Sequence, residues 1–353
     1  MTAHQHIPES ARETCENGTL SRRRLGLIGY PIGHSLSPTL FREYFASRPD
    51  ILAQWEYDLI ERSTFDEARA AFLQDYTAVN VTAPFKENAF RTADSHDYSA
   101  LRCQASNLLV KTPSEGVKAY NTDFEAVLDI LRQEHTAFQT GATGKTAKDN
   151  EIRKMKVLVI GAGGAGKAAT AAAVEAGMQT SIWNRTSGRA IEFADHLHQY
   201  DPHGLGSVTR IIGTSSVPFE NSCPATDPTT VSASEHRNPD RAHASIPQDI
   251  QPDTINFIQA ELLTAVRQSD IIVYTLPGPS TSDHTFHHTK AECSFLTLLD
   301  TEPDILSGKT VIEANYKDPV LADTPCRRYI SGLTWLRLQA IATYRIVLGP
   351  SFL

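Results

Sequence analysis

A glycine-rich turn between an apolar strand and an alanine-rich helix has the residue types of a phosphate-binding site. The strand is expected at 156–160 and the helix at 167–176. The turn between them contains Gly161, Gly163, Gly164 and Gly166. Gly161 permits a tight turn, Gly163 lets the backbone approach a pyrophosphate, and Gly166 lets the helix pack close to the strand. Since free N–H groups at a helix N-terminus bind phosphate, the turn predicts a dinucleotide site.

The end of the next strand, expected at 180–183, indicates which dinucleotide binds. About 20 residues beyond the first strand, an NAD site needs a carboxylate for the ribose 2′-hydroxyl. This chain has Asn184, Arg185 and Thr186 at that place, and Arg189 adds positive charge. Because an arginine can pair with a 2′-phosphate, we predict that the cofactor is NADP.

A second group of residues has the types needed to hold a polar acid and to move a proton. Ser35 and Ser37 offer hydroxyls for a carboxylate. Ser37 precedes Pro38 and is also expected to cap a helix, whereas Ser35 has no such structural duty and is the stronger ligand candidate. Lys86 is a candidate general acid, and Asp123 could orient its amine. Which of the two moves the proton stays open, because such a pair titrates as a unit.

Each of these residues also has a simpler interpretation when it is taken alone. Lys86 would be a solvated lysine in the first turn of a helix, and Asp123 an N-terminal helix residue favoured by the helix dipole. Arg185 alone would be a surface arginine at a strand end. Their order along the chain favours the functional interpretation.

In that order the motifs resemble those of the shikimate dehydrogenase family, from Leu25 to Gly349. The similar segments are 29–38, 80–86, 105–107, 121–123, 161–166, 184–186, Tyr316 and 338–340. The resemblance implies that Lys86 and Asp123 are catalytic. It implies that the substrate is bound by Ser35, Ser37, Thr82, Asn107, Tyr316 and Gln339. The implied activity is the reversible, NADP-dependent reduction of 3-dehydroshikimate to shikimate.

Several departures from the family pattern leave the exact substrate open. Gln104 stands where a glycine is usual, Leu108 replaces a threonine, and the segment before Tyr316 begins with Glu313. One alternative is therefore a quinate or quinate/shikimate dehydrogenase, or an enzyme for a related cyclic hydroxy acid. Another is a non-catalytic sensor of shikimate or quinate, which should have lost the lysine or aspartate that this chain retains.

Composition limits the class of protein. The chain has 353 residues and a formal net charge of −8, which argues against a nucleic-acid partner. Its apolar runs have strand length, so no membrane span is expected. The five cysteines lack C-x-x-C spacing and are expected to be reduced thiols in a cytoplasmic protein. His284, His287 and His288 lie in a polar loop, and no metal site is predicted. The expected partner is a small-molecule substrate, and the protein is a monomer or homodimer.

Alternating strand and helix patterns predict an α/β fold with a largely parallel sheet in the first half. Strands are expected at 25–28, 55–60, 78–81, 108–110, 117–119, 156–160, 180–183, 270–274 and, as the last one, 310–313. Helices are expected at 37–45, 65–73, 123–132, 167–176, 257–266 and 333–348, and one more from Pro84.

The chain is predicted to form two α/β domains around a deep cleft. Residues 24–123 with 333–353 would form the substrate-binding domain, and 124–332 a Rossmann-type NADP domain. Residues 1–23 read as a disordered tail, 135–153 as a linker loop, and 213–254 as a flexible insertion. The insertion and the tail favour a fungal-type, stand-alone member of the family.

Overall fold

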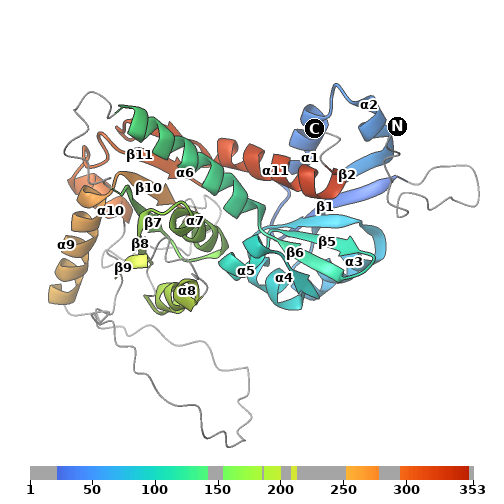
Figure 1. The fold of residues 1–353 in the computed structure, drawn as a ribbon, viewed down its shortest axis with the longest axis horizontal. Coiled ribbons are helices and arrows are strands. Elements are labelled where there is room, and N and C mark those ends of the chain that lie inside the picture. The colour runs from blue at the N-terminus through green and yellow to red at the C-terminus, as the bar shows by residue number, and fades with distance from the viewer. Residues whose placement is uncertain are drawn as a thin grey trace, which may run out of the picture.

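Two α/β domains make up the computed structural model, which describes residues 22–141, 154–184, 187–199, 208–212, 252–277 and 295–349 (Figure 1). The two-domain α/β fold predicted from the sequence is confirmed. Most of the predicted tail and of the insertion 213–254 lies outside the described residues, as do His284, His287 and His288. Arg23, assigned to the tail, instead begins the first strand.

The first domain holds a sheet in the order β2-β1-β3-β5-β6-β4. Its elements are β1 (Arg23–Gly29), α1 (Ser37–Tyr44), α2 (Pro49–Gln54), β2 (Trp55–Glu61), α3 (Phe65–Asp75), β3 (Ala78–Val81), α4 (Lys86–Thr92), β4 (Ser95–His96), α5 (Tyr98–Cys103), β5 (Leu108–Thr112) and β6 (Gly116–Tyr120). β1 pairs in parallel with β2 and β3, but β5 runs antiparallel to both β3 and β6. The sheet is therefore mixed, because the predicted β5–β6 hairpin returns through it.

The second domain holds a sheet in the order β12-β11-β10-β7-β8-β9, in which every pairing is parallel. Its elements are β7 (Lys156–Ile160), α7 (Gly164–Glu175), β8 (Gln179–Trp183), α8 (Ser187–Gln199), β9 (Val208–Ile212), α9 (Pro252–Gln268), β10 (Ile271–Tyr274), α10 (Phe295–Thr301), β11 (Thr310–Glu313) and β12 (Arg328–Ile330). Two long helices flank these elements in the chain, α6 (Thr122–Gly141) before β7 and α11 (Gly332–Leu348) after β12. The strand order reverses between β7 and β10, because β8 and β9 follow on one side of β7 and β10, β11 and β12 on the other. In doubly wound sheets, ligands bind outside the carboxyl ends of the strands at this point.

Several predicted boundaries are wrong. Ser37 is the first residue of α1 and not its cap, since Leu36 occupies the cap position. The helix expected at Pro84 begins at Lys86, and the helix expected at Asp123 begins one residue earlier. That helix continues to Gly141, so the expected linker 135–153 is helical over its first seven residues.

Three further boundaries differ in the second domain. α7 begins at Gly164, so the last two glycines of the turn are already helical. α9 begins at Pro252, inside the segment expected to be an irregular insertion. β11 is not the last strand, because β12 follows it.

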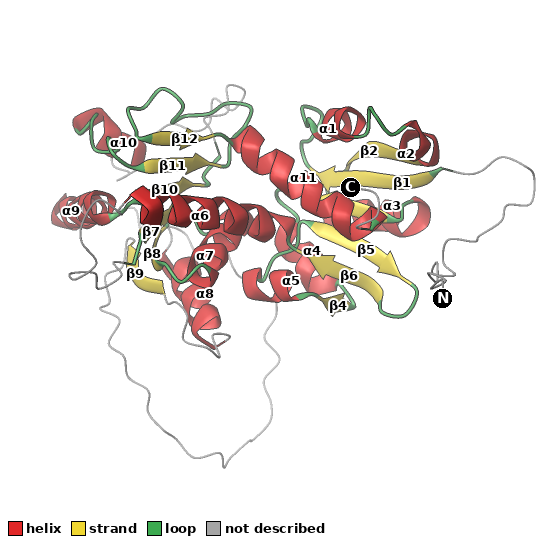
Figure 2. Ribbon diagram, turned by 45° about the horizontal axis from the view of Figure 1, so that its top comes forward, coloured by secondary structure: helices red, strands yellow, loops and turns green. Residues whose placement is uncertain are grey.

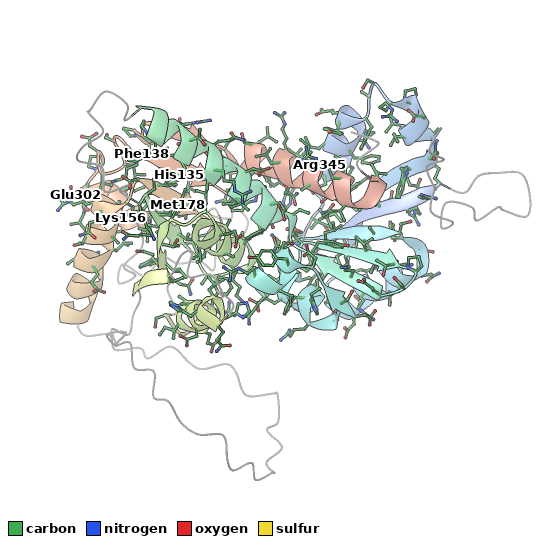
Figure 3. All side chains as sticks on the ribbon, viewed as in Figure 1. His135, Phe138, Lys156, Met178, Glu302 and Arg345 are labelled. Atoms are coloured by element: carbon green, nitrogen blue, oxygen red, sulfur yellow. The ribbon has the colours of Figure 1, made fainter. Side chains whose placement is uncertain are left out.

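Each sheet is buried on both faces, since alternate residues of its strands belong to different apolar clusters. In β7, Val157 and Val159 face one cluster, and Leu158 and Ile160 face the other. Phe138 of α6 packs against the cluster that contains Met178 (Figure 3). Burial on both faces is typical of parallel sheets covered by helices.

Two long helices connect the domains. α6 leaves the first sheet after β6 and packs against α7 and α11. α11 starts beside β12 and runs to the first domain, where it contacts α1 (Figure 2). There Tyr344 packs against Phe41 and Phe45. Within the described part of the chain, no helix has the length and apolar character to cross a membrane.

Candidate active site

The predicted substrate and catalytic residues gather at one edge of the first sheet. β1, β3 and β6 end at this edge, and β5, which runs the opposite way, begins there. Lys86 follows β3, Asn107 precedes β5, and Asp123 follows β6. Consequently all three residues lie at the same edge of the sheet. Residues far apart in sequence meet because of strand direction.

Lys86 and Asp123 face each other, as the predicted chemistry requires. Lys86 Nζ lies 2.6 Å from Asp123 Oδ2, and the side chains are 17% and 9% exposed. The other carboxylate oxygen, Oδ1, accepts a hydrogen bond of 2.9 Å from the indole N–H of Trp335. The carboxylate is thus held from two sides, and the ammonium is directed by a charge-assisted hydrogen bond.

Asn107 and Gln339 meet beside this pair. Asn107 Nδ2 donates to Gln339 Oε1 at 2.8 Å, while Asn107 Oδ1 accepts from the backbone N–H of Thr122 at 2.7 Å. The hydroxyl of Thr122 lies 3.3 Å from Gln339 Oε1. Loops at this edge of the first sheet and α11 therefore supply one continuous set of amide and hydroxyl groups, which suits a ligand with several hydroxyls.

A second set of polar groups lies deeper in the same domain. The buried Asn80 accepts from the Tyr57 hydroxyl at 2.8 Å and donates to Thr343 Oγ1 at 3.0 Å. Burial raises the pKa of the Tyr57 hydroxyl; a hydrogen bond with Ser37 opposes this rise, and the nearby Tyr316 hydroxyl adds to it. Ser37, Tyr57 and Tyr316 are therefore neighbours at the expected position of the substrate carboxylate.

Ser35 has a structural role, although the sequence predicted none for it. Its Oγ accepts from the backbone N–H of Ser37 at 3.3 Å and lies 3.2 Å from Ser37 Oγ, so it supports the start of α1. Thr82, after β3, lies against the turn that follows β1, because a methyl group on Gly29 would come within 2.4 Å of Thr82 Cγ2. The substrate contacts predicted for Ser35, Ser37, Thr82, Asn107, Tyr316 and Gln339 remain predictions.

The glycine turn after β7 has the geometry of a dinucleotide cradle. Gly161 has a φ of +112°, a conformation that residues with a side chain rarely adopt. A methyl group on Gly166 would lie 2.0 Å from the Gly161 carbonyl oxygen, whereas one on Gly163 would meet no atom within 4 Å. The turn is closed toward the protein and open at Gly163, and α7 begins immediately after it. These residues fit a bound pyrophosphate at the helix N-terminus.

Gly164 joins the glycine turn to the lysine–aspartate pair. A methyl group on Gly164 would lie 2.8 Å from Lys86 Cδ, so the lysine stem passes directly over the first turn of α7. The amine therefore lies at the end of the same helix that the cofactor phosphates would contact. The carboxyl ends of the two sheets thus contribute to one site.

The residues predicted to select NADP are partly described. Asn184 Oδ1 accepts from the backbone N–H of Ala162 at 3.1 Å and so ties the end of β8 to the glycine turn. Arg189 lies exposed in the first turn of α8. Arg185 and Thr186 lie outside the described residues.

Sequence reasoning missed Tyr57, Thr122, Trp335 and Thr343 as parts of this site. A signal was present in α11, where Trp335, Gln339 and Thr343 recur every fourth residue and so lie on one face. All three residues donate or accept hydrogen bonds at the site.

Comparison with known proteins gives two family matches. Residues 27–109 match the model for the shikimate dehydrogenase substrate binding domain, and residues 144–265 match the model for shikimate / quinate 5-dehydrogenase. Together these ranges cover more than half of the chain.

Individual relatives carry related names. The shikimate dehydrogenase of Thermotoga petrophila is 33% identical over 105 residues, which are 30% of this chain and 39% of that protein. The shikimate dehydrogenase (NADP(+)) of Methanocella arvoryzae is 30% identical over 175 residues, which are 50% of this chain and 58% of that protein. The matches therefore span less than two thirds of either relative. The crystal structure of Mycobacterium tuberculosis shikimate dehydrogenase shares the fold, with a TM-score of 0.58 and 23% identity over 93% of this chain and 94% of that one.

Proposed function

Because the chain belongs to the shikimate dehydrogenase family, we propose that it is an NADP-dependent oxidoreductase that reduces 3-dehydroshikimate reversibly to shikimate. One observation carries this proposal: the 2.6 Å pair of Lys86 and Asp123 lies against the first turn of the glycine-turn helix. The reduction of a ketone requires a proton donor beside the site that binds the hydride-donating cofactor.

Lys86 is the proton donor in this proposal. NADPH held by the glycine turn would supply the hydride. The Lys86 ammonium would donate a proton to the ketone oxygen of the substrate, and the Lys86 amine would take that proton back in the reverse reaction. Asp123 already accepts hydrogen bonds at both of its oxygens, so it orients the amine and balances its charge.

The amide and hydroxyl groups supply substrate recognition. Asn107 and Gln339 would bind ring hydroxyls beside Lys86, while Ser35, Ser37 and Tyr316 would bind the substrate carboxylate through hydroxyl groups. Thr82 would contact the same ring from the end of β3. The support is their position around the lysine and the neighbourhood of Ser37, Tyr57 and Tyr316.

We assign the 2′-phosphate of NADP to Arg185, with Asn184, Thr186 and Arg189 beside it, on the grounds of sequence position and the name of the Methanocella relative. The division into 24–123 with 333–353 and 124–332 is part of the same proposal. So are a cytoplasmic location, a monomeric or homodimeric state, and the absence of a nucleic-acid partner, which rests on the net charge of −8.

The test is a substrate panel with the purified chain. Shikimate, quinate and 3-dehydroshikimate are each assayed with NADP(H) and NAD(H) by the change in nicotinamide absorbance. Turnover of shikimate and 3-dehydroshikimate with NADP(H) supports the proposal, and a Lys86→Ala variant that keeps its rate contradicts the site. Preferred turnover of quinate favours the quinate enzyme. Binding of shikimate with no turnover favours the sensor.

A further inference from the structure

We propose that Trp335 is a positioning residue that fixes the Asp123 carboxylate so that Lys86 points into the site. This inference rests on the proposed function, because it assigns the third member of the proton-transfer group. The indole N–H donates to Asp123 Oδ1 at 2.9 Å, and the Lys86 ammonium donates to Oδ2 at 2.6 Å. Lysine, carboxylate and indole therefore form one chain of hydrogen bonds.

The tryptophan is itself held firmly. Its side chain is buried in the apolar cluster that contains Ile312 and Ile330, with 3% of the residue exposed. It lies in the first turn of α11, which Ser331 caps by accepting from the N–H of Thr334. A ring packed in this way has little rotational freedom, so its N–H has a fixed direction. The hydrogen bond therefore fixes the orientation of the Asp123 carboxylate.

An indole is suited to this task because it can only donate. Its N–H donates to a carboxylate oxygen and the ring has no acceptor to offer in return, so the hydrogen bond can run in one direction only. The aliphatic stem of Lys86 is flexible and lies against Gly164. Without the indole, Asp123 would be free to turn about its side-chain bonds, and the direction of the ammonium would follow it.

A spectroscopic experiment tests the contact without any need for turnover. The chain has three tryptophans, Trp55, Trp183 and Trp335, so three indole N–H resonances are expected in a proton–nitrogen NMR spectrum. The Trp335→Phe variant identifies the resonance of Trp335. The Asp123→Asn variant, which keeps the ring, is expected to move that resonance upfield and leave the other two in place, because a hydrogen bond to a charged oxygen is stronger than one to an amide oxygen. An unmoved resonance overturns the proposal.

The kinetic experiment then separates positioning from packing. Trp335→Phe is expected to lower kcat about ten- to a hundredfold and to change KM for shikimate by less than about twofold, since the substrate groups remain and only the proton donor is misdirected. Trp55→Phe, in the core at the start of β2, is the matched control and keeps the wild-type values.

The outcomes distinguish this inference from the function on which it rests. If wild-type protein shows no turnover of shikimate but the Trp335 resonance responds to Asp123→Asn, the proposed function fails and the indole–carboxylate contact stands. If turnover is present and Trp335→Phe keeps the wild-type kcat, the positioning role is wrong. A Trp335→Phe variant that changes only KM overturns it as well.

Discussion

At the scale of single residues, the site depends on buried polar groups whose partners are nearly all supplied within the fold. Asn80 is 7% exposed, and its amide oxygen accepts only from the Tyr57 hydroxyl among the described residues. A buried acceptor that loses its donor costs more than the net value of the hydrogen bond, because water cannot replace the donor. Asn80 in turn donates to Thr343 of α11. A displaced Asn80 would therefore also displace the substrate-binding groups beside it.

The Tyr57→Phe variant tests this arrangement. It is expected to lower the free energy of unfolding by about 1–3 kcal/mol, the cost of an unsatisfied buried acceptor. Denaturant unfolding measures the change. Tyr344→Phe is the control, because Tyr344 belongs to the same apolar cluster and no hydrogen bond of its hydroxyl occurs among the described residues. Equal losses in the two variants would contradict the role of the Tyr57–Asn80 bond.

At the scale of elements, the start of α7 has two roles, and each depends on a different one of two neighbouring glycines. Gly163 faces open space where a pyrophosphate would lie, whereas Gly164 touches the stem of Lys86. The sequence predicted the turn and the first of these duties from the spacing of the glycines. The second depends on how the domains meet, which no local pattern contains.

Alanine substitutions of these glycines are therefore expected to act on different kinetic constants. Gly164→Ala places a methyl group 2.8 Å from Lys86 Cδ, displaces the lysine, and lowers kcat about tenfold or more. Gly163→Ala meets no protein atom, so its expected effect is a higher KM for NADPH through crowding of the phosphates. Steady-state kinetics with both substrates measures the difference. The assignment is wrong if both variants change only the KM for NADPH.

The loop after β11 is a second element whose role was not evident from the sequence. The Glu313 carboxylate is fully buried and accepts from the backbone N–H groups of Val320 and Leu321 at 2.7 and 3.1 Å. It also accepts from the Tyr329 hydroxyl at 2.7 Å. The carboxylate thus closes the loop that carries Tyr316.

Replacing Glu313 with Gln keeps the shape of the side chain but turns an amide N–H₂ toward a backbone N–H or a tyrosine hydroxyl. We expect Glu313→Gln to raise KM for shikimate through the displaced Tyr316 and to destabilise the fold by about 1–3 kcal/mol. Shikimate kinetics and denaturant unfolding measure the two effects. Tyr316→Phe is the comparison, since it should alter KM with little effect on stability.

Sequence reasoning succeeded where chemistry is encoded locally and failed where it depends on packing. The lysine, the aspartate and the glycine turn each stand in a short motif, and strand direction brings them together. Trp335 and Thr343 were missed because an indole and a threonine on a helix have the pattern of core residues. Ser37 was expected to be a cap because Ser–Pro is a common helix start, but it is the first residue of α1, and its backbone N–H donates to Ser35 Oγ.

At the scale of the whole molecule, polar contacts between the domains hold the site together. Lys167 of α7 pairs with Glu87 of α4 at 3.0 Å, and Tyr98 donates to Glu175 at 2.6 Å. Gln104, where the family has a glycine, adopts the left-handed conformation with a φ of +46°. This conformation explains the usual glycine. In this chain the glutamine side chain instead reaches His196 of α8 at 2.9 Å.

The His196 contact makes the stability of the interface depend on pH. Burial lowers the pKa of the His196 imidazole, against the opposing hydrogen bond to the Leu101 carbonyl, and the charge of Arg102 adds to the fall. The unfolded chain therefore binds this proton more readily than the folded chain. The stabilisation is fully present above the unfolded pKa of about 6.5 and is lost as the pH falls from there through the folded pKa.

We expect wild-type protein to lose more free energy of unfolding than His196→Gln when the pH falls from about 7.5 to about 5.5. Denaturant unfolding at both values measures the two losses. The other histidines are the same in both proteins, so the difference between the losses isolates residue 196. The variant is also expected to be less stable at the higher pH, because it loses the fitted contacts to Gln104 and the Leu101 carbonyl. Equal losses on acidification would show that His196 titrates as it does in the unfolded chain, and the buried contact between α5 and α8 would then have no part in the acid sensitivity of the interface.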